Sequence, residues 1–135
     1  MTPRIASCYC GQLRIELKGK FLGGGVCHCV ACQRRTGSVF AALAGFAPPY
    51  EVTGTATEFS RVGDTGGKAT FRFCPTCGST VFHTQAGEEE KLVLVAVGAF
   101  ADPSFPPPED SVYDSLRHPW VQLPPGTKAF ARDPD

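Results

Sequence analysis

The chain has 135 residues and a mass of 14.4 kDa, with 42% hydrophobic and 19% charged side chains. This length is sufficient for one hydrophobic core but not for two, so we expect a single domain over residues 1–135. Thirteen Lys and Arg residues balance thirteen Asp and Glu residues, which leaves no basic field that would favour binding to nucleic acid or an anionic membrane.

The first predicted elements are short strands joined by glycine-rich turns. Residues 12–18 alternate between apolar and polar side chains, which is typical of a strand with one buried face. The three glycines at 23–25 then predict a flexible turn. Residues 38–46 are apolar and are followed by a Pro-Pro pair, so we expect another strand there.

The middle of the chain predicts hairpins and one buried strand. Residues 92–97 form a continuous Val, Leu and Ala run of strand length, which indicates a central strand buried on both faces. No long amphipathic helix is predicted, so the expected fold class is all-β. His83 is predicted to be a packing or surface residue of its strand. Four further runs rich in Val, Thr and Phe are separated by turns, at residues 51–53, 55–60, 68–73 and 79–84.

The last quarter of the chain is rich in proline. Eight of the twelve prolines lie from Pro103 to Pro134. Because proline donates no backbone hydrogen bond, we expect a strap of extended segments and turns rather than a second domain. No apolar run is long enough to span a bilayer, and residues 1–10 lack the apolar stretch of a signal peptide. We therefore expect no membrane association and a cytoplasmic location.

Seven cysteines are the most informative feature of the composition. An odd number in a chain without an export signal favours metal binding or catalysis over disulfides. Thiolates two or three positions apart can bind one Zn²⁺ ion, and a glycine after Cys-x-x-Cys permits the tight turn of a zinc knuckle. The cysteines form three groups: Cys8 and Cys10; Cys27, Cys29 and Cys32; and Cys74 and Cys77.

Seven ligands divide most naturally into a closed site of four and an open site of three. One partition joins the two Cys-x-x-Cys units, at 29–32 and 74–77, in a single site. The other joins the pairs at 8–10 and 74–77, each of which is followed by glycine. It leaves the three cysteines of 27–32 as a second cluster. Spacing alone supports both partitions.

Four runs of the sequence, taken together, resemble the glutathione-dependent formaldehyde-activating enzyme family, which includes the centromere protein V group. These runs are CYCG, CHCVACQRRTGSVFAALAGF, FRFCPTCGSTVF and VAVGAFADP, and the similarity extends over about residues 8–125. The segment at residues 111–120 follows the family pattern more loosely, with Ser111 where a histidine is expected.

The resemblance implies a fold and a set of zinc ligands. The fold would be a small zinc-binding β-sheet structure related to the zinc-bearing Rab chaperones, with the Pro-rich segment as a C-terminal strap. Two Zn²⁺ ions per chain are implied. These are a structural zinc at Cys8, Cys10, Cys74 and Cys77, and a second zinc with an open coordination position at Cys27, Cys29 and Cys32.

The resemblance also implies an activity. The chain would be a zinc-dependent carbon–sulfur lyase or synthase acting on adducts of glutathione, or a related thiol, with small aldehydes such as formaldehyde. S-hydroxymethylglutathione is the expected adduct. The competing hypothesis is a zinc-stabilised protein-interaction module without catalytic activity, because structural zinc sites also stabilise small domains.

Five residues outside the cysteines are candidates for the chemistry of the open site. Three thiolates around Zn²⁺ leave a formal charge of −1, so neighbouring cations are needed to offset it. His28 and Arg34 are candidate catalytic residues for this reason. Arg35, Thr36 and Trp120 are candidate contacts to glutathione.

Overall fold

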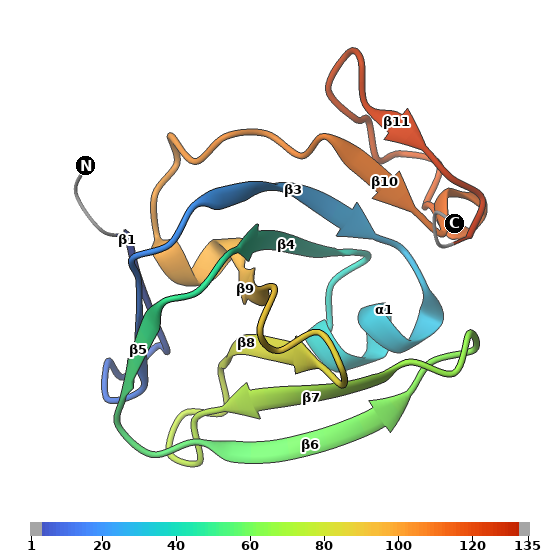
Figure 1. Ribbon diagram of the computed structural model, residues 1–135. Helices are drawn as coiled ribbons and strands as arrows, with labels where there is room; N and C mark the ends of the chain where they lie inside the picture. The colour runs from blue at the N-terminus through green and yellow to red at the C-terminus, as the bar shows by residue number, and fades with distance from the viewer. Residues whose placement is uncertain (1–3, 133–135) are drawn as a thin grey trace.

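Two β-sheets form most of the fold over residues 4–132, which are the residues described by the computed structural model (Figure 1). The smaller sheet has the order β1 (Arg4–Ser7), β2 (Arg14–Leu17) and β5 (Tyr50–Thr53). The larger sheet has the order β11 (Lys128–Ala129), β10 (Asp110–Val112), β3 (Phe21–Cys27), β4 (Ala41–Phe46), β9 (Val93–Ala96), β8 (Thr80–Gln85), β7 (Lys68–Phe73) and β6 (Thr57–Val62).

One short α-helix and two 3₁₀ helices complete the fold. The helix α1 (Val30–Thr36) follows β3, and the 3₁₀ helices are η1 (Val97–Phe100) and η2 (Asp114–Leu116). The larger sheet curls, so that β3 and β10 lie on one side of the fold and β6 and β7 on the other (Figure 1). Helix α1 lies between these two sides at one end of the strands (Figure 1).

The hydrophobic core lies between the two sheets. Ile15 of β2 is fully buried in the same cluster as Phe46 of β4 and Val95 of β9. Cys8 and Cys74 belong to this cluster as well, with 4% and 0% of their surface exposed. The turns that carry these two cysteines are therefore tied to the packing that joins the sheets.

Most of the predicted strands are confirmed, with ends that differ by at most three residues. The prediction for residues 23–25 is wrong, because these glycines lie inside β3. A Cβ atom at Gly24 would lie 3.0 Å from the Leu43 carbonyl oxygen, and one at Gly25 would lie 3.2 Å from the Asp110 carbonyl oxygen. The glycines thus allow close approach of the neighbouring strands rather than a turn.

The prediction for residues 92–97 is correct in position but wrong about burial. Strand β9 lies between β4 and β8, as expected for a central strand. Val93 and Val95 are fully buried, but Leu94 is only half-buried and lines a cavity on the other face of the sheet. One face of β9 therefore packs in the core, and the other contributes to the candidate site.

The Pro-rich segment is extended, as predicted, but it also contributes regular sheet structure. Strand β10 pairs in parallel with β3 on one side and with β11 on the other. Residues 109–118 contain no proline, so the backbone donors needed for this pairing are present. In the part of the chain that is described, no helix is long and apolar enough to cross a membrane.

Candidate metal centres and an adjoining cavity

Four cysteines from two turns meet at the edge of the core. The turn between β1 and β2 carries Cys8 and Cys10, and the turn between β7 and β8 carries Cys74 and Cys77. Their four Sγ atoms lie within 4.8 Å of one another. Cys10 Sγ is 3.6 Å from Cys8 Sγ and 3.7 Å from Cys74 Sγ. We call this group the four-cysteine cluster.

Each of the two turns has a glycine with a positive φ angle directly after its second cysteine. Gly11 and Gly78 adopt φ angles of +87° and +82°, a region that residues with a side chain rarely occupy. The Gly11 N–H donates to the Cys8 carbonyl at 3.1 Å, and the Gly78 N–H donates to the Cys74 carbonyl at 2.8 Å. The tight turn predicted from the glycine after Cys77 is therefore confirmed, and Gly11 closes a turn that is one residue shorter, with Cys10 inside it.

Hydrogen-bond donors surround the sulfur atoms of this cluster. Cys74 Sγ accepts the Gln12 side-chain amide at 3.0 Å and the backbone N–H of Thr76 at 3.3 Å. Hydrogen bonding with the Ser79 hydroxyl and backbone lowers the pKa of Cys77 to about 5. Such donors stabilise thiolates, which is the protonation state that binds a metal ion.

The other three cysteines lie where β3 passes into α1. Cys27 ends β3, Cys29 is the N-cap residue of α1, and Cys32 lies in its first turn. The Cys32 N–H donates to Cys29 Sγ at 3.3 Å, so the capping bond also fixes the position of a sulfur atom. Their Sγ atoms again lie within 4.8 Å of one another. We call this group the three-cysteine cluster.

Charge is distributed unevenly among these three thiols. Hydrogen bonding with Cys27 and the positive charge of Arg35 lower the pKa of Cys32 to about 5, against the effect of burial. The hydrogen bond to Cys32 and burial raise the pKa of Cys27. Cys32 therefore loses its proton more readily than Cys27.

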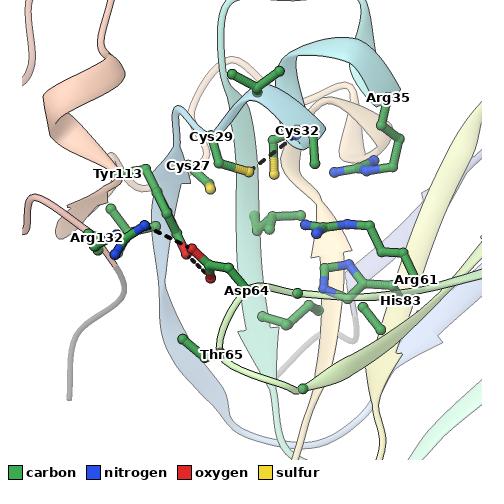
Figure 2. A pocket seen from close by; sticks show the side chains of 18 of the residues that line it. Cys27, Cys29, Cys32, Arg35, Arg61, Asp64, Thr65, His83, Tyr113 and Arg132 are labelled. Atoms are coloured by element: carbon green, nitrogen blue, oxygen red, sulfur yellow. Dashed lines mark hydrogen bonds and ion pairs between the residues drawn. The ribbon is translucent and has the colours of Figure 1, made fainter.

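A cavity of about 560 Å³ adjoins the three-cysteine cluster (Figure 2). It lies among α1, the strands β6 to β9 and the segment that follows β10. The lining contains none of the other four cysteines. Its charged and polar lining residues, besides the three cysteines, include Arg35, Arg61, Asp64, His83, Gln85, Tyr113 and Arg132.

His83 lies in the cavity wall as a neutral imidazole. Burial and the positive charges of Arg35, Arg61 and Arg72 lower its pKa to about 3. Its ring centroid is 4.6 Å from that of Phe71, the residue that it pairs with across β7 and β8. The prediction that His83 is a packing residue is correct as far as burial is concerned, but the residue also faces the cavity.

The turn after β6 meets the C-terminal segment at the cavity (Figure 2). Asp64 of this turn accepts a hydrogen bond from the Tyr113 hydroxyl. Its carboxylate also pairs with the Arg132 guanidinium at 3.4 Å. These contacts connect the two sides of the curled sheet.

Arg35 is the only one of the five candidate residues outside the cysteines that lines the cavity. His28 is fully buried, with Nε2 3.0 Å from Ser111 Oγ, and Arg34 is exposed. The Thr36 hydroxyl donates to the Cys32 carbonyl at 2.8 Å, and Trp120 is 70% exposed. The roles predicted for these four residues stay predictions.

Sequence reasoning missed Arg61, Asp64, Tyr113 and Arg132 as cavity residues. His83 lies in a predicted strand and Arg61 lies one residue beyond the predicted end of another, but no motif marks either residue. Their common side of the sheet follows from the pairing of β6, β7 and β8, which places Arg61 opposite Ala69 and His83 opposite Phe71. A correct cross-strand register would have been the signal.

A comparison with known protein families gives a match over most of the chain. Residues 3–115 match the glutathione-dependent formaldehyde-activating enzyme family. The chain belongs to this family. The chain is similar to a Rhodobacter sphaeroides protein whose crystal structure was solved as a structural genomics target. The TM-score is 0.55 and the sequence identity is 25%. The similarity covers 76% of this chain and 91% of that chain. A search of curated proteins found no match to this chain.

Proposed function

We propose that the chain is a zinc-dependent carbon–sulfur lyase or synthase for adducts of glutathione, or a related thiol, with small aldehydes such as formaldehyde. The observation that carries the proposal is that the three-cysteine cluster faces a cavity, whereas the four-cysteine cluster does not line it. Family membership supports the same reaction class. We also propose that the chain is a single domain whose fold is related to that of the zinc-bearing Rab chaperones.

The sulfur geometry fits Zn²⁺. A tetrahedral ion about 2.3 Å from each sulfur places neighbouring sulfur atoms about 3.8 Å apart. The separations of Cys10 Sγ from Cys8 Sγ and Cys74 Sγ, 3.6 and 3.7 Å, agree with that value. Cys8, Cys10, Cys74 and Cys77 would hold a closed site, and Cys27, Cys29 and Cys32 would leave a fourth position for a thiol. Zinc at such a site lowers the pKa of a bound thiol.

The proposed reaction joins a thiol and an aldehyde. The thiol loses its proton, and its sulfur attacks the carbonyl carbon and forms a carbon–sulfur bond. The π-electron pair of the carbonyl moves to oxygen, which takes up a proton to give the S-hydroxymethyl product. The reverse reaction breaks the carbon–sulfur bond and releases the same two compounds.

The chain's own residues would favour this reaction through charge and position. Arg35 lies one helical turn after Cys32 and offsets the negative charge of the thiolates. The cavity holds the reactants next to each other, which lowers the entropic barrier to a bimolecular step.

The proposal is tested by following free formaldehyde in the presence of glutathione and the zinc-loaded chain. We expect formaldehyde to disappear faster than in the uncatalysed reaction, in proportion to the amount of protein. Cys29→Ser should lose this acceleration, because it removes one of three ligands of the open site. A wild-type chain with two bound zinc ions per molecule and no acceleration would contradict the proposed function.

A further inference from the structure

Two arginines meet at the wall of the cavity, beside the three-cysteine cluster (Figure 2). Arg35 comes from the last turn of α1 and Arg61 from β6. The Arg35 guanidinium carbon lies 4.2 Å from the centroid of the Phe71 ring, and that of Arg61 lies 5.9 Å from the same centroid. The aromatic ring thus brings together two cations from different parts of the fold.

Several donors of these guanidinium groups are buried and have no partner. They are Nε and Nη2 of Arg35 and Nε of Arg61. A buried donor without an acceptor is costly, and native structures contain few of them. The three nitrogen atoms therefore indicate that an acceptor supplied from outside the chain belongs here.

The residues described provide no carboxylate for either arginine. Asp64, which also lines the cavity, already contacts Arg132 and Tyr113. His83 carries no negative charge, and burial together with Arg35, Arg61 and Arg72 lowers its pKa to about 3. The neutral imidazole therefore leaves the positive charge of this wall uncompensated.

We propose that Arg35 and Arg61 bind a carboxylate carried by the thiol substrate. This inference rests on the proposed thiol chemistry at the three-cysteine cluster. Guanidinium groups hold carboxylates through paired N–H donors, and partial burial strengthens the interaction. Because Arg35 and Cys32 are neighbours on one helix face, the carboxylate would lie a few bonds from the reacting sulfur.

The test compares two small thiols that differ in charge, 3-mercaptopropionate and 2-mercaptoethanol. Their dissociation constants are measured by calorimetric titration of the zinc-loaded chain, without aldehyde. We expect the carboxylate thiol to bind about tenfold more tightly or better, as for a charged hydrogen-bonded pair. Arg61→Gln should remove this preference and leave the affinity for 2-mercaptoethanol unchanged.

Two further variants separate the charge of Arg61 from its effect on folding. Arg61→Lys should retain part of the preference, and Arg14→Gln, at an exposed position of β2, should retain all of it. Zinc content and thermal unfolding show whether each variant is folded. Equal affinity for the two thiols in the wild-type chain, absence of binding, or a preference that persists in folded Arg61→Gln would overturn the proposal.

These measurements do not depend on turnover. A carboxylate preference that requires Arg61, in a chain without formaldehyde turnover, would support the anion site and contradict the function proposed above. Formaldehyde turnover without any carboxylate preference would support the proposed function and contradict the anion site.

Discussion

The protonation state of single buried residues determines the charge of the cavity. His83 is neutral because burial and three arginines oppose its protonation, and Asp64 is engaged by Arg132 and Tyr113. Arg35 and Arg61 therefore give this wall a positive charge. A site of this kind favours anionic ligands and thiolates over neutral thiols.

The low pKa of His83 predicts a pH dependence of stability. The folded-state pKa of about 3 lies below the ordinary value of 6.5, so between these values the unfolded chain binds a proton that the folded chain does not. The stability is therefore fully present above pH 6.5 and decreases as the pH falls, by about 1.4 kcal/mol per pH unit. His83→Gln should remove this contribution.

The measurement is the free energy of unfolding in denaturant at pH values from 7.5 to 4.5, for the wild-type chain and for His83→Gln. Proton binding by the cysteines and loss of metal affect both proteins alike, so the difference between the two curves isolates His83. Parallel curves over this range would contradict the assignment of a neutral buried imidazole.

Element boundaries were predictable where local composition decides them. The β-branched and aromatic runs at β6, β7 and β8 form strands because their side chains suit a pleated sheet, whatever their partners. The glycines of β3 were misinterpreted because only the neighbouring β4 and β10 explain why side chains are absent there. The seven cysteines indicated metal binding. How they divide into two ligand sets depends on which turns the sheets bring together.

The segment after β10 is held to the metal-binding loop by a buried polar chain. His28 Nε2 lies 3.0 Å from Ser111 Oγ, and the Ser111 hydroxyl donates to Asp114 Oδ1 at 2.8 Å. Asp114 also accepts from Arg117 at 3.0 Å. These contacts connect β10 and η2 to the loop between Cys27 and Cys29.

Ser111→Ala should break this connection. It leaves the His28 ring nitrogen without a partner and removes one of the two hydrogen bonds that Asp114 Oδ1 accepts, which costs about 1–3 kcal/mol. The matched control is Ser115→Ala, because Ser115 is exposed and its hydroxyl donates only to the Ala131 carbonyl. Denaturant unfolding should show a clear loss of stability for Ser111→Ala and little change for Ser115→Ala. Equal stability of the two variants would show that the buried chain does not hold the segment.

The two sheets meet at the four-cysteine cluster. One cysteine pair lies in the turn between β1 and β2 of the smaller sheet, and the other lies between β7 and β8 of the larger sheet. A metal ion bound by both pairs would connect the sheets next to the hydrophobic core, whereas an ion at the three-cysteine cluster would bind β3 and α1 only. The clusters should therefore differ in their effect on the whole molecule.

Cys74→Ser should destabilise the entire fold, and Cys29→Ser should leave most of it intact. Cys74 is fully buried in the core, and the free energy of one structural zinc is on the order of 10 kcal/mol, similar to the stability of a whole domain. Soluble yield, zinc content and the dispersion of amide signals in a ¹H–¹⁵N spectrum measure the effect. We expect Cys29→Ser to yield a folded chain with one tightly bound zinc. Loss of the folded spectrum to the same extent in both variants would show that the two clusters stabilise the fold equally. The proposal that one cluster is structural and the other catalytic would then be wrong.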